Sequence, residues 1–124
     1  MATKKLRKQQ SKSLIAQLEA FRDLLKRFVK ELQSGKLPPA QELDQAQSDL
    51  LKGLTHSEFA ADLTGLQRWL RSEALELIAA LNAPIPEAAP IAVLFAAQLK
   101  RFEEISKEAV RLMGGKPHFW EKSI

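Results

Sequence analysis

The chain has 124 residues, of which 45% are hydrophobic, so it is the size of one domain and can bury a sizeable core. It contains no Cys, which excludes a disulfide framework and a thiolate metal site. The formal net charge is +4, and no apolar run approaches the roughly 18 residues that a membrane-spanning helix needs. Tyr is absent and Gly is scarce, whereas Ala, Leu, Glu, Lys and Gln dominate, as is typical of helical proteins.

The charge is divided unevenly along the chain. Residues 1–36 hold ten Lys/Arg against three Asp/Glu, and residues 37–87 hold three against eight. Residues 88–124 hold six against four. A basic end beside an acidic middle suggests a nucleic acid or an acidic partner.

The first 12 residues are polar and basic, and we predict a flexible arm there. Its cations have no acidic residue among them: Lys4, Lys5, Arg7, Lys8 and Lys12. Lys and Arg neutralise phosphates without reading sequence, so the arm is a candidate nucleic-acid contact. The alternative is a terminus that only improves solubility. The apolar stretch that follows is too short and too polar for a secretory signal, so we expect a cytoplasmic protein.

From Ser13 onward the apolar residues follow a helical seam. They step by four and three residues along the chain: Leu14, Leu18, Phe21, Leu25, Phe28 and Leu32. Gly35 is placed to end this helix in the left-handed conformation. The polar side carries Lys26, Arg27 and Lys30 within one turn, which we add to the nucleic-acid surface, although Asp23 can pair with Arg27 at i+4.

Two further helices are predicted in the acidic middle. Pro38 and Pro39 favour a turn and the start of a short helix that ends at Gly53. One unbroken helix is then predicted over 55–82, because Thr55 and Glu58 match a capping box. Its apolar positions have the helical period: Phe59, Leu63, Leu66, Leu70, Ala74, Leu77 and Leu81.

The last predicted helix runs from about Pro90 to Met113. Its first half, residues 91–97, is apolar all round and is expected to be buried on several sides. Gly114 is expected to cap it. In the tail, Phe119 and Trp120 either plug the open end of the bundle or serve as a docking peptide.

These elements predict an all-α, four-helix bundle-like single domain with one short helix, the second, and three long ones. The domain covers residues 13–115, between a basic arm at 1–12 and an aromatic tail at 116–124. Because the second helix is short, part of the apolar surface should need another chain, and we expect a homodimer or a protein partner. The expected core includes Leu25, Phe28, Leu66, Leu70, Leu77, Phe95 and Phe102.

Trp69 has two interpretations. It is either a core or rim tryptophan, or, with Arg68 and Arg71 beside it, a protein-interface anchor or stacking platform. In either case its ring is expected to cover the turn that holds Gly65, since helical side chains lean toward the N-terminus.

No pattern of catalytic residues is present. His56 and His118 are single and far apart, and neither belongs to a pair of histidines or to an HExxH motif. We therefore expect no enzymatic activity, no catalytic residue, no metal and no cofactor.

The sequence thus predicts a non-enzymatic accessory subunit of a nucleoprotein assembly that contacts the backbone of RNA or DNA. In size, helicity and charge division the chain resembles the small helical subunits of CRISPR effector complexes. The resemblance concerns these physical properties alone, and no sequence motif supports it. The alternative is a protein-only helical adaptor or self-associating module without a nucleic-acid role.

Overall fold

The computed structural model describes the backbone of residues 2–114 and the side chains of residues 8–114. Its helices are α1 (Ala2–Gln33), α2 (Ala40–Thr55), α3 (Thr64–Arg71), α4 (Glu73–Leu81) and α5 (Ala88–Leu112). The structure is 79% helical, above the two-thirds expected from the sequence, and the described residues form no strand. Because only Ser72 separates α3 from α4, these two helices act as one wall, and the predicted all-α four-helix bundle is confirmed.

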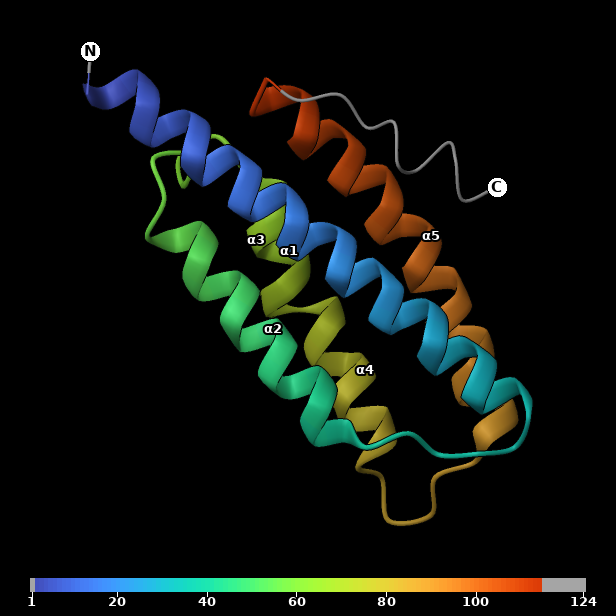
Figure 1. Cartoon of the computed structure of the whole chain (residues 1–124). Helices are drawn as coiled ribbons and strands as arrows, with labels where there is room; N and C mark the ends of the chain where they lie inside the picture. Colours follow the sequence, from blue (N-terminus) through green and yellow to red (C-terminus); the bar gives the residue numbers. More distant parts are fainter. Residues whose placement is uncertain (1, 115–124) are drawn as a thin grey trace.

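The helices run alternately up and down. In Figure 1, α1 lies in front with α2 on one side and α5 on the other, and α3 and α4 lie behind. When α3 and α4 are taken as one wall, consecutive members of the bundle are antiparallel neighbours, as predicted. Within residues 2–114, every helix is too short or too polar to cross a lipid bilayer.

The predicted core residues are all buried. Each of them exposes 1% of its surface or less: Leu25, Phe28, Leu66, Leu70, Leu77, Phe95 and Phe102. Aromatic rings from three helices meet at the centre of the bundle. The Phe102 ring lies 5.0 Å from the Phe21 ring and 5.0 Å from the Trp69 ring, measured between centroids. Such ring pairs add to the stabilisation that area burial gives, so this cluster joins α1, α3 and α5.

Residues 2–12, predicted as an arm, continue α1 without a break. Two side chains attach the end of this segment to the bundle. Ser11 is buried, and its hydroxyl donates to the Met113 carbonyl at 3.2 Å. The side-chain oxygen of Gln10 accepts a hydrogen bond from the Glu58 N–H at 3.0 Å. The first helix is therefore held at this end by both α5 and the segment that follows α2.

The predicted unbroken helix over 55–82 is wrong, and its first half is replaced by turns. α2 continues past Gly53 to Thr55, and residues 56–63 form turns before α3 begins. Ser57 explains the difference, because its hydroxyl donates to the Leu54 carbonyl at 2.8 Å and accepts from the Phe59 N–H at 3.1 Å. A serine that bonds to nearby backbone competes with helix formation. The predicted capping box does not form, because the Thr55 hydroxyl donates to the Lys52 carbonyl and the Glu58 N–H donates to Gln10 instead.

A second interruption lies at Ser72, whose φ of −125° and ψ of −74° are not helical. Its hydroxyl donates to the Arg68 carbonyl at 2.7 Å, a bond that bends helices. The buried side chain of Gln47 in α2 then donates to the Leu70 carbonyl at 2.8 Å, in place of a helical N–H. The Ser72 hydroxyl is also within hydrogen-bond distance of the Glu73 carboxylate, so its single proton is shared between two acceptors. The hydrogen bond to Glu73 lowers the pKa of that carboxyl from its ordinary value.

The helix ends at glycine are as predicted, whereas the burial of α5 is not. Gly35 and Gly114 have φ of +88° and +83°, the left-handed conformation that ends helices. The first half of α5 was expected to be buried on several sides, but Val93 is 72% exposed. Among the described residues, α5 packs against α1 and against the wall formed by α3 and α4, and no other helix covers the side that carries Val93.

Candidate nucleic-acid interface

Four lysines lie on one side of α1, which the helical geometry explains. Lys8 and Lys26 are 18 residues apart, and so are Lys12 and Lys30. At about 3.6 residues per turn this separation is five full turns, so both pairs face the same way about 27 Å apart. Lys8, Lys12 and Lys30 are exposed and Lys26 is partly buried. We call these four residues the lysine row.

Among the side chains of residues 8–114, no ion pair involves the lysine row. The ion pairs described for α1 join Arg22 to Asp23, at 3.3 Å, and Arg27 to Glu42. Glu19 lies between the two lysine pairs on the same side, seven residues from Lys12 and seven from Lys26. Asp23 lies on this side as well, seven residues before Lys30, so the row is two positive patches with two acidic residues between them.

Arg27, predicted to contact nucleic acid, is instead paired with a neighbouring helix. Its guanidinium forms an ion pair with Glu42 of α2 and lies 5.6 Å from the centre of the Phe28 ring. The predicted pair between Asp23 and Arg27 does not form, because Asp23 contacts Arg22. The geometry therefore places Arg27 as a link between α1 and α2 and leaves the lysines as the cations open to a ligand.

Part of the predicted site lies outside the described residues. Lys4, Lys5 and Arg7 belong to the helical part of the chain, but their side chains are not described. Phe119 and Trp120, predicted as interface residues, lie beyond residue 114.

Trp69 belongs to the core, so its interpretation as an interface anchor is wrong. The side chain is 1% exposed, and its indole N–H donates to the Gln98 side-chain oxygen at 3.0 Å. The ring does not cover Gly65 either, because a Cβ added to Gly65 would meet no atom within 4 Å. The indole is turned toward α1 and α5, where the other aromatic residues of the core lie.

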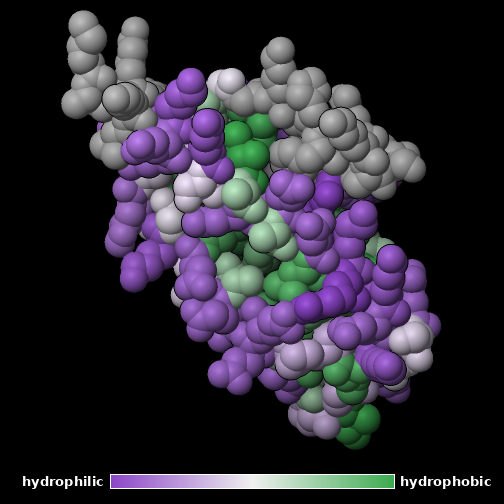
Figure 2. Space-filling view, in the orientation of Figure 1, coloured by the Kyte–Doolittle hydropathy of each residue, from purple (hydrophilic) through white to green (hydrophobic). Residues whose placement is uncertain are grey.

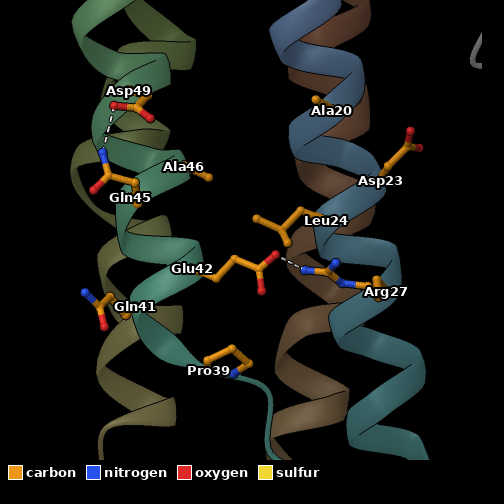
Figure 3. Close-up of a pocket in the computed structure, with 10 residues that line it drawn as sticks. All are labelled: Ala20, Asp23, Leu24, Arg27, Pro39, Gln41, Glu42, Gln45, Ala46 and Asp49. Atoms are coloured by element: carbon orange, nitrogen blue, oxygen red, sulfur yellow. Dashed lines mark hydrogen bonds and ion pairs between the residues drawn. The ribbon is translucent and has the colours of Figure 1, made fainter.

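A groove runs between α1 and α2. Its floor is apolar and its rim is acidic, whereas the lysine row is basic. It has a volume of about 930 Å³ and is lined by Ala20, Asp23, Leu24, Arg27, Pro39, Gln41, Glu42, Gln45, Ala46 and Asp49. Figure 3 shows Leu24 pointing into the gap while Arg27 and Glu42 meet across it. Figure 2 shows hydrophobic surface in the middle of this face between hydrophilic ridges. The sequence predicted uncovered apolar surface on the ground that the second helix is short, and this ground is wrong. α2 has 16 residues and is longer than α3 and α4, which have 8 and 9.

Small side chains account for the groove. Ala20 on α1 and Ala46 on α2 lie where larger residues would fill the space between the helices. The rim is acidic, with Asp23, Glu42 and Asp49 against the single cation Arg27. Among residues 8–114 no three His, Asp or Glu side chains are grouped to hold a metal ion.

The chain matches no protein-family model, no curated protein and no solved structure.

Proposed function

We propose that this protein is a non-enzymatic accessory subunit of a cytoplasmic nucleoprotein assembly, and that the lysine row of α1 contacts the nucleic-acid backbone. The observation that supports this function is the pair of lysine patches about 27 Å apart on one helix, which have no ion partner among the side chains of residues 8–114. Lysines four residues apart on a helix repel each other, so both patches are stabilised when an anion lies against them.

The spacing of the patches favours a duplex over a short single strand. Base pairs along B-DNA are about 3.4 Å apart, so 27 Å corresponds to about 8 base pairs. Contacts of this kind fix position without reading bases, and the proposed binding is independent of sequence.

Electrophoretic mobility shift with RNA and DNA duplexes across a salt series tests the function. Four lysine–phosphate contacts give a slope of log K against log salt of about −3.6, or roughly a 100-fold loss of affinity from about 50 to 200 mM salt. Replacing Lys8, Lys12, Lys26 and Lys30 by Ala should remove most of that slope. Duplexes shorter than about 8 base pairs should engage one patch and show about half the slope.

A matched variant removes the same charge from other faces, with Ala at Lys36, Lys52, Arg68 and Arg71, all of which are exposed. It should bind nucleic acid with a slope close to that of the unchanged protein. The proposed function fails if the two variants lose affinity equally, or if the unchanged protein binds no RNA or DNA at about 50 mM salt.

A protein-only adaptor is the second candidate, and the groove between α1 and α2 favours it. Its apolar floor and acidic rim fit the apolar face of a partner helix with basic residues along its edges. An apolar helical contact should persist as salt rises, whereas binding through the lysine row should not. A homodimer formed through this groove would have the same weak salt dependence.

A further inference from the structure

A second groove lies at the other side of the bundle, between the start of α3 and the end of α5. It has a volume of about 340 Å³. The apolar side chains that line it are Leu63, Leu66, Ile105, Ala109 and Leu112. Leu112 is 51% exposed, so one wall of the groove is open to water. This groove is separate from the lysine row and from the groove between α1 and α2.

Gly65 adds an independent observation. It lies in the first turn of α3 and lines the groove, and a Cβ built on it would meet nothing within 4 Å. Glycine weakens a helix relative to alanine. Nothing in the described part of the chain explains its use here, because no neighbouring atom approaches the empty position. A glycine beside open apolar space leaves room for a ligand to approach the backbone closely.

The rim of the groove is acidic. Asp62 lies at the α3 side, and Glu104 and Glu108 lie at the α5 side. Glu108 is 3.7 Å from Arg111, and both of these side chains are largely exposed. An occupant of the groove should therefore combine apolar side chains with flanking positive charge.

We propose that residues 116–122 of this chain dock in the groove between α3 and α5. The segment contains the adjacent aromatics Phe119 and Trp120 between Lys116 and Lys122, which match the apolar floor and the acidic rim. α5 ends beside the groove, and Gly114 has a φ of +83°, which turns the chain away from the helix axis. The occupant is thus joined to the groove wall itself.

The lengths are compatible with this assignment. Phe119 is five residues beyond Gly114, a reach of up to about 17 Å in extended chain. The α5 wall extends from Leu112 back to Ile105, which is about 10 Å of helix. A tail that folds back antiparallel to α5 therefore brings both aromatics over the apolar floor without stretching the chain.

The two tryptophans make the proposal measurable by NMR. The chain has only Trp69 and Trp120, so two indole N–H signals are expected, and the variant Trp120→Phe identifies the signal of the tail. If the tail is docked, the Trp120 signal lies away from its random-coil position and shows NOEs to the methyl groups of Leu63, Ile105 or Leu112. Its position should not change on dilution, because the contact is within one chain.

Leu112→Glu is the disruptive variant, since this half-exposed position tolerates a polar residue. The change removes part of the apolar floor and places a charged group where the aromatic rings would dock. It should return the Trp120 signal to the random-coil position and leave the Trp69 signal unchanged. Val93→Glu is the matched control, an exposed apolar residue of the same helix far from the groove, and it should move neither signal. The Trp69 signal reports that each variant is folded.

Several outcomes would overturn the proposal. The tail does not dock here if the Trp120 signal of the unchanged protein is at its random-coil position, or if Leu112→Glu leaves a shifted signal in place. NOEs from Trp120 to other parts of the bundle assign the tail to a different surface. A signal that moves on dilution shows that the occupant is the tail of a second copy.

Discussion

α1 packs against α5 on one side and against α2 on the other, and the two seams differ. Toward α5 the contacts are aromatic: the Phe21 and Phe102 rings are 5.0 Å apart, and the Phe28 and Phe95 rings are 6.1 Å apart. Toward α2 the facing residues Ala20 and Ala46 are small, and a groove of about 930 Å³ separates the helices. α1 therefore forms a closely packed seam with α5 and an open seam with α2. The volume of the side chains between the helices accounts for the difference.

Polar contacts show the same difference between the seams. At the α5 seam the buried Ser11 hydroxyl donates to the Met113 carbonyl. Across the α2 groove the link is the ion pair of Arg27 and Glu42, whose side chains are 52% and 44% exposed. Exposed ion pairs contribute little to stability, so α2 depends more on its buried contacts with α3 and α4.

The largest expected contrast is between two adjacent leucines of α1. Leu25 is fully buried in the core, whereas Leu24 lines the open groove. Leu25→Ala should reduce the free energy of unfolding by about 2–5 kcal/mol, as for other buried leucines. Leu24→Ala is the matched control and should cost less than about 1 kcal/mol, since the groove already exposes it to water. Urea denaturation of both variants measures the difference, and equal losses would mean that the two seams are alike.

Gln47→Leu tests how α2 is held. The change removes the hydrogen bond to the Leu70 carbonyl at the helix break and leaves that carbonyl without its donor in a buried site. The free energy of unfolding should fall by about 1–3 kcal/mol. Gln45→Leu, at an exposed position of the same helix, is the control and should change it by less than about 0.5 kcal/mol. A Gln47 variant as stable as the control would remove Gln47 from the contacts that hold α2.

The ion pair across the groove should have a small effect. A double-mutant cycle of Arg27→Ala and Glu42→Ala should give an interaction energy of about 0.2–1 kcal/mol, decreasing as salt rises. Thermal denaturation at low and high salt measures it. An interaction energy above about 2 kcal/mol would show that the open seam is held as firmly as the aromatic one.

The smallest effect is expected from filling the groove. Ala46→Leu adds apolar volume to space that is already open, so the free energy of unfolding should change by less than about 0.5 kcal/mol. The same enlargement at Ala74, whose side chain is fully buried, should cost about 1–3 kcal/mol, because a larger residue would overpack the core there. If Ala46→Leu is equally damaging, the groove is not open in the folded protein.

The sequence predicts those parts of the fold that depend on local pattern. The apolar period identifies the core, including Phe59 and Leu63, which are buried although the chain around them is not helical. The ends of α1 and α5 follow from Gly35 and Gly114. Gly53 is different, because its Cβ position lies 3.0 Å from the Gln17 side-chain oxygen, so this glycine allows α1 and α2 to approach rather than ending a helix.

The features that the sequence does not predict depend on contacts between distant residues. The break at Ser72 is accommodated because Gln47, 23 residues before Leu70, donates to the exposed carbonyl. Arg27 is occupied because Glu42 comes from another helix. The candidate site could be predicted as a set of cations, but only the packing of the helices shows that the lysines are the members without an ion partner among the described side chains.

An NMR titration of the protein with a duplex longer than about 8 base pairs at about 50 mM salt tests the proposed role of α1 most directly. The backbone amide signals of residues 8–12 and 26–30 should shift together, and those of α2 and α4, which carry acidic residues, should stay in place. Adding salt to about 200 mM should reverse the shifts. Shifts centred on α2 or α4, or no shifts at low salt, would contradict a nucleic-acid contact through the lysine row.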